Sequence, residues 1–256
     1  MKNVLIGTTM IAGLIVAGAA QAADMPLKAQ MAPAYFSWTG FYVGGNFGGG
    51  WSDASFSITP TGSWLGFPAS IPNLIATDKT LHPTSFMGGG QVGYNYQINN
   101  FVWGIEADID SYQAKTTFIG GAIPTTSITA ISQGSQQHWL ATVRGRLGIA
   151  WDRVLIYGTA GLAASDWDVN MHMTSGGADA VFLSDKTRTG WTAGGGFEVA
   201  AFGNWSIKGE YLYADLGHAT GSSVFPSPPN GAGFTHDHSV HLITQMVRFG
   251  INYHFW

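Results

Sequence analysis

Charged side chains are scarce in this sequence of 256 residues, where Asp, Glu, Lys and Arg together make up only 10%. Soluble domains carry about 25%, because a surface that faces water needs them. Apolar residues make up 45% of the chain and aromatic residues 13%, which is more apolar area than a disordered chain carries. The composition therefore indicates a folded protein whose outer surface is largely covered by something other than water.

Long apolar runs, a basic excess and cysteine are also missing. After residue 22, no run of about 18 apolar residues appears that could cross a bilayer as a helix. The net charge of −4 and the isoelectric point near 6.0 exclude a basic surface, so no nucleic acid is expected as a partner. The absence of cysteine fits an oxidising compartment and fits chance equally well.

The first 22 residues have the pattern of a secretory signal peptide. Lys2 supplies the positive start, residues 4–19 the apolar stretch, and Ala20-Gln21-Ala22 the small-x-small cleavage pattern. A short anchor helix is the alternative, but the stretch contains several glycines and is shorter than the ~20 residues that a span needs. Export then places residues 23–37, rich in Ala and Pro, in the periplasm as a linker.

Beyond the linker, eight segments alternate between apolar and polar residues with period two, as half-buried β-strands do. They comprise residues 38–51, 84–97, 101–112, 138–150, 154–167, 188–200, 205–215 and 240–256. Short turns at 99–100, 151–153 and 201–204 alternate with long polar segments at 52–83, 113–137, 168–187 and 217–239. This pattern predicts an all-β fold over residues 38–256: an eight-stranded antiparallel transmembrane β-barrel with four long extracellular loops and short periplasmic turns.

The positions of the charges test this prediction, because a Lys or Arg that faces lipid costs about 2–4 kcal/mol at the bilayer midplane. With the apolar row of each strand turned outward, no Lys or Arg faces lipid, and the strand charges fall in the lumen. The predicted lumen charges are Glu106, Asp108, Arg144, Arg146, Glu198, Lys208, Glu210 and Arg248. Asp110 and Arg188 are also expected to face inward.

A soluble β-sandwich is the alternative. It would have the same alternation with the faces inverted, so that the charged row faces water and the large apolar row faces the core. Tryptophan positions favour the barrel, because they fall on the apolar row near strand ends, where interfacial aromatic girdles lie. The predicted girdle residues are Trp51, Trp103, Trp139, Trp151, Trp167, Trp191 and Trp205.

Three stretches carry a resemblance to a known family. They are Trp-Thr-Gly-Phe-Tyr-Val-Gly-Gly-Asn at 38–46, Asn-Trp-Ser-Ile-Lys-Gly-Glu-Tyr-Leu-Tyr-Ala-Asp-Leu-Gly at 204–217, and Val-Arg-Phe-Gly-Ile-Asn-Tyr-His-Phe at 247–255. With them, the mature chain resembles the small alphaproteobacterial outer-membrane β-barrel proteins of the porin-family or immunogenic type, built on an OmpA-like eight-stranded barrel. The long segments match that family least.

The resemblance implies residence in the cell outer membrane, contact with lipid and lipopolysaccharide, and insertion by the barrel assembly machinery. Members of the family usually end in an aromatic residue that follows alternating apolar residues. Here Tyr253 and Phe255 continue the outward row, and Trp256 is one residue extra. These three residues are the candidate assembly signal.

The lumen of an eight-stranded barrel is just wide enough for side chains to fill. The charges are therefore expected to plug it, which leaves the protein a structural and surface-interaction role. A porin-like channel for small solutes is the alternative, because Gly44, Gly48, Gly194 and Gly196 on the inner row leave room for a narrow polar path.

Enzymatic chemistry has little support in the sequence. Glu106, Asp108 or His138 near the outer rim offer an acid and a base. However, the chain has no Gly-x-Ser-x-Gly nucleophile motif, no His-Glu-x-x-His zinc motif and no phosphate-binding loop. No catalytic residue, metal site or cofactor is therefore predicted.

Three histidines lie close together at the end of the last long segment: His236, His238 and His241. The first two share a face if the chain is extended. Imidazole is a common ligand of metals and haem iron, and some members of the resembling family bind haem. A surface site for haem or another ligand is thus a minor hypothesis, beside the alternative that these histidines belong to an ordinary polar loop.

Overall fold

The computed structural model describes residues 36–124, 126, 128–175, 178–225 and 233–255. The predicted signal peptide, most of the predicted linker, and Trp256 lie outside the described residues. Within the described ranges, no helix is long and apolar enough to cross a membrane.

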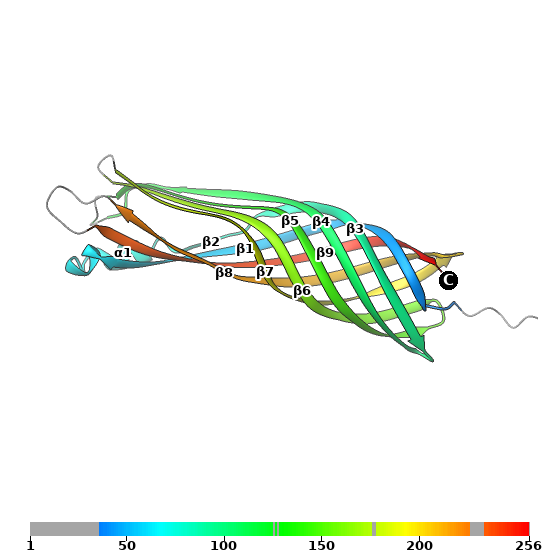
Figure 1. The fold of residues 1–256 in the computed structure, drawn as a ribbon. Coiled ribbons are helices and arrows are strands. Elements are labelled where there is room, and N and C mark those ends of the chain that lie inside the picture. The colour runs from blue at the N-terminus through cyan, green and yellow to red at the C-terminus, as the bar shows by residue number, and fades with distance from the viewer. Residues whose placement is uncertain (1–35, 125, 127, 176–177, 226–232, 256) are drawn as a thin grey trace, which may run out of the picture. The chain divides into compact units, whose positions relative to one another are not determined.

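Eight long strands form a closed ring (Figure 1). They are β1 (Gly40–Gly62), β3 (Thr84–Ile98), β4 (Phe101–Gly120), β5 (Ile128–Trp151), β6 (Val154–Ser175), β7 (Ala178–Phe202), β8 (Trp205–Phe225) and β9 (Phe234–Phe255). Each is antiparallel to its neighbours, and β9 returns to β1, with Phe255 opposite Phe41 and Phe234 opposite Gly62. The prediction of an eight-stranded antiparallel β-barrel is confirmed.

Two-residue turns join β3 to β4, β5 to β6 and β7 to β8 at one end of the ring, which we call the turn end. The first residue of each turn has a positive φ: Asn99 at 54°, Asp152 at 50° and Gly203 at 52°. Asn, Asp and Gly tolerate this backbone conformation, which matches the twist of the flanking strands. Two residues therefore suffice for each turn.

The far end differs from the expected set of four long polar loops. Most residues of those segments continue the strands, so that β1 runs to Gly62 and β7 already begins at Ala178. The alternation is hard to see in the sequence, because Ser, Thr and Gly occupy many of the outward positions.

Residues 63–81 form the one segment of this end that contains other elements within the described chain. It holds the 3-10 helix η1 (Ser63–Gly66), the short helix α1 (Ile71–Ile75) and the strand β2 (Lys79–Leu81). β2 pairs with β1 at Ala54 to Phe56, beyond the point where β3 leaves β1.

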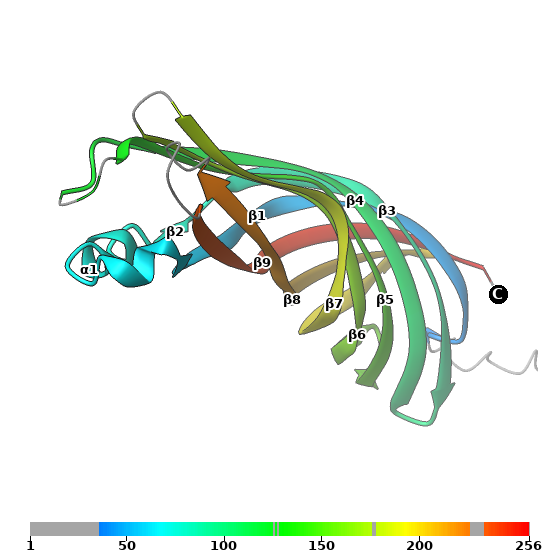
Figure 2. The ribbon, with the colours of Figure 1, turned by 60° about the vertical axis from the view of Figure 1, so that its left-hand side comes forward.

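The ring separates into two sheets toward the far end (Figure 2). Pairing of β7 with β8 ends at Trp191 opposite Asp215, and pairing of β1 with β3 ends at Trp51 opposite Thr84. Beyond these pairs, β2, β1, β9 and β8 form one sheet, and β4 to β7 form the other. We call the described residues among 52–82, 112–139, 166–190 and 216–243 the two-sheet section, and the remainder of the ring the closed section.

The interior changes character between the two sections. The two-sheet section is filled by apolar side chains, among them Phe56, Met171 and Phe182, and none of its described Lys, Arg, Asp or Glu residues is buried. The closed section buries the charged side chains, together with a small apolar cluster that includes Trp38, Val102 and Leu155 near the turn end. Apart from register shifts on β5 and β8, the alternation continues from one section to the other, but the inner row carries charged side chains in the closed section and mainly apolar ones in the two-sheet section.

Six of the seven predicted girdle tryptophans lie on the outer face, at two levels. Those near the turn end are Trp103, Trp151 and Trp205, and those near the level where the ring opens are Trp51, Trp139 and Trp191. Between the levels, the outward side chains include Ile105, Val143, Leu147, Phe249 and Ile251, all about half exposed or more. They form an apolar band around the closed section.

Trp167 does not belong to the girdles, contrary to the prediction. Odd-numbered residues of β6 face the interior from Leu155 to Met173, and Trp167 is 0% exposed. Its side chain packs in the core of the two-sheet section. Its position in the alternation, and not its nearness to a strand end, decides its direction.

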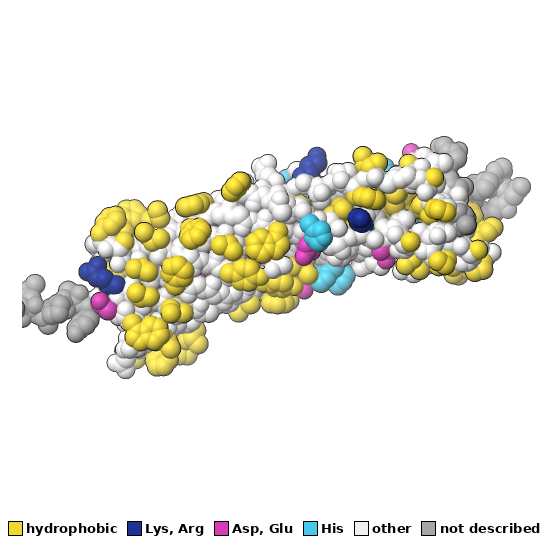
Figure 3. All heavy atoms as spheres, turned by 180° about the vertical axis from the view of Figure 1, so that it is seen from behind, with side chains coloured by type: hydrophobic (Ala, Val, Ile, Leu, Met, Phe, Trp, Pro, Cys, Tyr) yellow, Lys and Arg dark blue, Asp and Glu magenta, His cyan; other side chains and the backbone are white. Residues whose placement is uncertain are grey.

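Three outward His–Asp pairs mark the end of the apolar band, and we call them the His–Asp belt. The pairs are His82 with Asp53 at 2.6 Å, His138 with Asp168 at 2.9 Å, and His241 with Asp215 at 3.1 Å. Figure 3 shows histidine and acidic side chains interrupting the apolar surface near the middle of the strands.

Replacing Trp167 by Ala should lower the free energy of unfolding by about 3–5 kcal/mol, because it empties a packed core position. Trp191→Ala is the matched control, since the Trp191 side chain is 52% exposed on the outer face, and its loss should cost less. Urea unfolding of the refolded protein in detergent micelles, followed by tryptophan fluorescence, measures both. Equal losses would contradict the interior position of Trp167.

Candidate functional site

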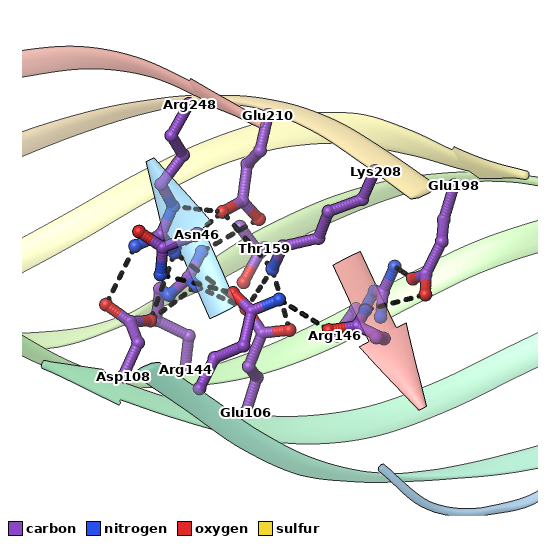
Figure 4. Close-up of polar contacts among 12 residues, drawn as sticks. Asn46, Glu106, Asp108, Arg144, Arg146, Thr159, Glu198, Lys208, Glu210 and Arg248 are labelled. Atoms are coloured by element: carbon purple, nitrogen blue, oxygen red, sulfur yellow. Dashed lines mark hydrogen bonds and ion pairs between the residues drawn. The ribbon is translucent and has the colours of Figure 1, made fainter. Parts of the chain in front are cut away.

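The interior of the closed section holds a cluster of charged side chains (Figure 4). All eight predicted lumen charges lie on the inner row, and each is at most 6% exposed. Asp110, expected inside but not assigned to the cluster, is a ninth member, because its carboxylate lies 2.8 Å from Arg248 Nη1. We call these nine residues, from β4, β5, β7, β8 and β9, the lumen network.

Pairs of opposite charge face each other across neighbouring strands. Arg144 on β5 is the register partner of Glu106 on β4, and their Nη2 and Oε1 atoms are 2.5 Å apart. Arg248 on β9 is likewise opposite Glu210 on β8, with Nη2 2.7 Å from Oε2. These contacts follow directly from the alternation and the register.

Other ion pairs cross the lumen. Lys208 on β8 places Nζ 2.8 and 2.9 Å from the two carboxylate oxygens of Glu106 on β4. Arg144 reaches Glu210 Oε1 at 3.0 Å, and Arg248 reaches Asp108 at 2.9 Å. Because β4 and β5 lie across the ring from β8 and β9, these pairs span the middle of the barrel.

A second group of ion pairs lies around Arg146 and Glu198, which form an ion pair with each other. Glu198 also accepts hydrogen bonds from Ser206 Oγ at 2.5 Å and Asn252 Nδ2 at 2.7 Å. The Arg146 guanidinium lies 3.6 Å from the ring centre of Tyr157. Buried charges are tolerated only when they are paired and hydrogen-bonded in this way.

Neighbouring atoms pack closely against the inner-row glycines that the channel alternative relies on. A Cβ at Gly44 would lie 2.1 Å from Asn252 Oδ1, and one at Gly48 would lie 2.9 Å from the Arg248 Cβ. A Cβ at Gly196 would lie 2.9 Å from the Tyr157 hydroxyl. The missing side chains therefore make room for these larger neighbours.

Arg188, also expected inside, does not join the lumen network. It lies on β7 beyond the last β7–β8 pair. Its guanidinium donates to Ser184 Oγ at 2.6 Å and to the carbonyl oxygen of His218 on β8 at 3.4 Å. Arg188 thus bridges the two strands where they no longer pair.

The residues considered for acid–base chemistry do not form an acid–base site. Glu106 and Asp108 are each held by Arg144, whereas His138 lies on the outer face beside Asp168 in the His–Asp belt. They are therefore separated by the wall of the barrel.

The three clustered histidines do not lie on the same face of β9. His236 and His238 share a face of β9, as expected, but that face points into the two-sheet core, where they are 0% and 4% exposed. His241 is on the opposite face, in the His–Asp belt. An exposed site built from all three is therefore excluded, because the positions have different parity in one extended strand.

Burial lowers the pKa of His236 and of His238 to about 4, so both imidazoles are neutral at neutral pH. The described residues contain no group of three or more His, Cys, Asp or Glu side chains that could hold a metal ion.

The candidate assembly signal lies at the turn end of β9. Phe255 is 51% exposed on the outer face, and the Tyr253 ring lies 5.1 Å from the ring of Trp205 on β8. Both residues continue the outward apolar row, and Trp256 lies outside the described residues.

Among solved structures, the chain is similar to the outer membrane protease OmpT from Escherichia coli, with 9% identity, a TM-score of 0.49, and coverage of 86% of this chain and 98% of the other. It is also similar to the outer membrane protein OprG from Pseudomonas aeruginosa, with 14% identity, a TM-score of 0.45, and coverage of 85% and 97%.

Among curated sequences, the chain is 35% identical to a 31 kDa outer-membrane immunogenic protein of Brucella melitensis, over 85% of this chain and 88% of the relative. It is 33% identical to a 22 kDa outer membrane protein of Rhizobium leguminosarum, over 62% and 67%. The family model for the outer membrane protein beta-barrel domain matches residues 10–255. The protein therefore resides in the outer membrane and belongs to the outer membrane protein beta-barrel family.

Proposed function

We propose that the protein is a closed barrel that anchors the two-sheet section in the outer membrane and displays it outside the cell. The observation that carries this proposal is the lumen network, whose ion pairs run across the interior from β4 and β5 to β8 and β9. In barrels of this class the short turns face the periplasm, so the far end is the extracellular end.

A porin-like channel for small solutes is the alternative function. The paired charges in the lumen argue against it. The four cations of the lumen network are each paired with carboxylates among its five acidic side chains at contact distance. Tyr42 and Tyr157 add hydroxyl donors to Glu106 at 2.7 Å and to Glu210 at 3.1 Å. A solute would have to break several of these contacts at once, and each charge left unpaired in the interior is costly.

Lipid and lipopolysaccharide are the proposed surroundings of the closed section. The apolar band between the two levels of tryptophans suits the hydrocarbon layer, and the His–Asp belt lies where polar headgroups begin. The outward row ending at Tyr253 and Phe255 is the proposed signal for the barrel assembly machinery.

The extracellular tip supports a surface-interaction role. Residues 54–77 contain no charged side chain, yet Leu65, Phe67 and Ile75 are 69%, 55% and 46% exposed around η1 and α1. α1 lies at the far end of the strands (Figure 1). Exposed Leu and aromatic side chains without charge suit insertion into a lipid surface. We therefore assign an apposed lipid surface as the partner of this tip.

Planar-bilayer recordings should show near-zero conductance for the wild-type protein and for Arg144→Ala, because neighbouring side chains still fill the lumen. Arg144→Ala should nevertheless lower the free energy of unfolding by about 3–5 kcal/mol, since Glu106, Asp108 and Glu210 lose a partner. Arg153→Ala, in an exposed turn, is the control and should change stability by no more than about 0.5 kcal/mol. Regular conductance steps from either folded protein would refute the closed lumen.

The tip is tested by flotation of the barrel, held in lipid nanodiscs, with uncharged phosphatidylcholine vesicles. The double variant Leu65→Ser/Phe67→Ser should bind at least about tenfold more weakly, because each buried Leu or Phe contributes about 1.5–3 kcal/mol. Leu183→Ser removes a side chain that is 67% exposed on β7 and should leave binding unchanged. Failure of the wild type to float, or equal flotation of the double variant, would count against this partner.

A further inference from the structure

Two stacked imidazoles lie in the apolar core of the two-sheet section. His236 and His238 are 0% and 4% exposed, and their ring centres are 6.1 Å apart. Among the described residues, both ring nitrogens of His236 and Nδ1 of His238 lack a hydrogen-bond partner, whereas Nε2 of His238 lies 2.7 Å from Ser223 Oγ on β8. A proton added to either ring would create a charge that no contact compensates, which is costly in an apolar interior.

The elements packed around the pair bring no counter-ion to it. The side chains that surround the rings are apolar: Trp64 of η1, Ile58 and Pro60 of β1, Phe225 of β8 and Phe182 of β7. Apart from the pair, no described His, Asp, Glu, Lys or Arg of the two-sheet section is buried. Asp237 on β9 and Asp78 beside β1 are exposed, and they accept hydrogen bonds from Ser222 Oγ and from the backbone N–H of Ile58. An imidazolium is attracted to aromatic rings, but weakly compared with the hydration it would lose.

The boundary between β7 and β8 next to the pair is not held by a β-ladder. We call residues 178–190 of β7 and 216–225 of β8, which do not pair with each other, the seam. Phe182 stacks on His238 and lies against Gly221, where an added Cβ would be 2.3 Å from the Phe182 ring. Together with the hydrogen bond from Arg188 to the His218 carbonyl, this packing closes the seam. A charge on the pair would weaken it.

The pair also contacts the extracellular tip through Trp64. The Trp64 ring lies 5.4 Å from His236 and 4.6 Å from Phe234, and the side chain is 5% exposed. Leu65, the next residue, and Phe67 are exposed apolar side chains of the tip. Loss of the packing around His236 would therefore free Trp64 to join them.

We propose that protonation of His236 and His238 opens the two-sheet section along the seam and adds its apolar core to the extracellular tip. Acid then strengthens insertion of the tip into an apposed lipid surface, and this consequence rests on the function proposed above. Trp64 and Phe182 supply further apolar area, whose burial in lipid favours binding. The lumen network, in the closed section, is not part of this switch.

The pH range of the opening follows from the two environments of the imidazoles. Burial, and for His236 also the neighbouring His238, lowers their pKa to about 4, whereas an exposed imidazole has a pKa of about 6.5. The closed form therefore keeps its full stability above about pH 6.5 and loses it as the pH falls toward about 4. Over that range each imidazole shifts the equilibrium toward the open form by about two orders of magnitude.

Thiol accessibility measures the opening, because the chain contains no cysteine. Met171→Cys places a thiol in the core, where Met171 is 1% exposed, and Leu183→Cys places one on the outer face of β7. Dithiodipyridine, which reacts with thiols in acid, is added to each barrel in lipid nanodiscs. Relative to the exposed thiol, the buried one should react at least about tenfold faster at about pH 4.5 than at about pH 7.

The switch is removed by His236→Phe/His238→Gln, in which neither side chain titrates. A phenyl ring needs no hydrogen-bond partner among aromatic rings, and glutamine can still donate to Ser223, so this variant should fold and show no acid-induced rise. His241→Gln, on the outer face of the same strand, is the control and should respond as the wild type does. Heat-modifiable migration in gels verifies folding. If the double variant does not fold, His238→Gln alone should show a smaller rise than the wild type.

Flotation with uncharged phosphatidylcholine vesicles tests the link to the tip. The wild type should bind at least about tenfold more strongly in acid than at neutral pH, and the double histidine variant should bind equally at both. The switch is overturned if the buried thiol of the folded wild type stays protected in acid, or if the double variant opens in the same way. Opening with unchanged flotation overturns the link to the tip. Opening without flotation at any pH refutes the lipid partner and leaves the switch intact.

Discussion

Backbone hydrogen bonding inside lipid is the constraint on which the rest of this structure depends. Hydrocarbon offers no partner to an N–H or C=O group, so a sheet that crosses a membrane must close on itself. The pairing of β1 with β9 completes the ring, and eight strands enclose an interior narrow enough for side chains to fill. The outward row must then be apolar, and the inward row receives the polar groups. The lumen network satisfies that requirement with paired charges and few free polar atoms.

The constraint relaxes where the strands leave the membrane, and the molecule changes accordingly. Beyond Trp191 and Asp215, β7 and β8 no longer pair, because water can solvate a free strand edge. The inner row becomes apolar, since the outer face now meets water and a core must be built from hydrophobic side chains. One set of strands therefore carries two interiors of opposite polarity.

The closed section could be predicted from the sequence because every strand there shows a strict alternation with large apolar residues on one row. Arg144, Lys208 and Arg248 could be placed inside from their parity alone. The two-sheet section could not, because its outward Ser, Thr and Gly resemble loop residues. Register shifts between Gln137 and Trp139 and between Asp215 and His218 also change parity without a signal in the sequence. Trp167 and His241 show that the position in the alternation, more than the residue type, decides which way a side chain faces. Trp167 is buried although tryptophan was expected on the outer face. His241 faces outward, whereas His238, three residues earlier, faces the core.

In the proposed placement, the His–Asp belt limits how deeply the protein sits in the membrane. Displacement toward the periplasm would carry Asp53, Asp215 and their histidines into hydrocarbon. Displacement away from the periplasm would move the exposed turn of Asp152 and Arg153 into the periplasmic leaflet of the membrane. It would also expose Phe249 and the neighbouring apolar side chains to water. Both movements are opposed by the cost of charge in lipid or of apolar surface in water. The barrel therefore has one stable height, and the reach of its extracellular tip above the lipid surface is fixed by the lengths of its strands.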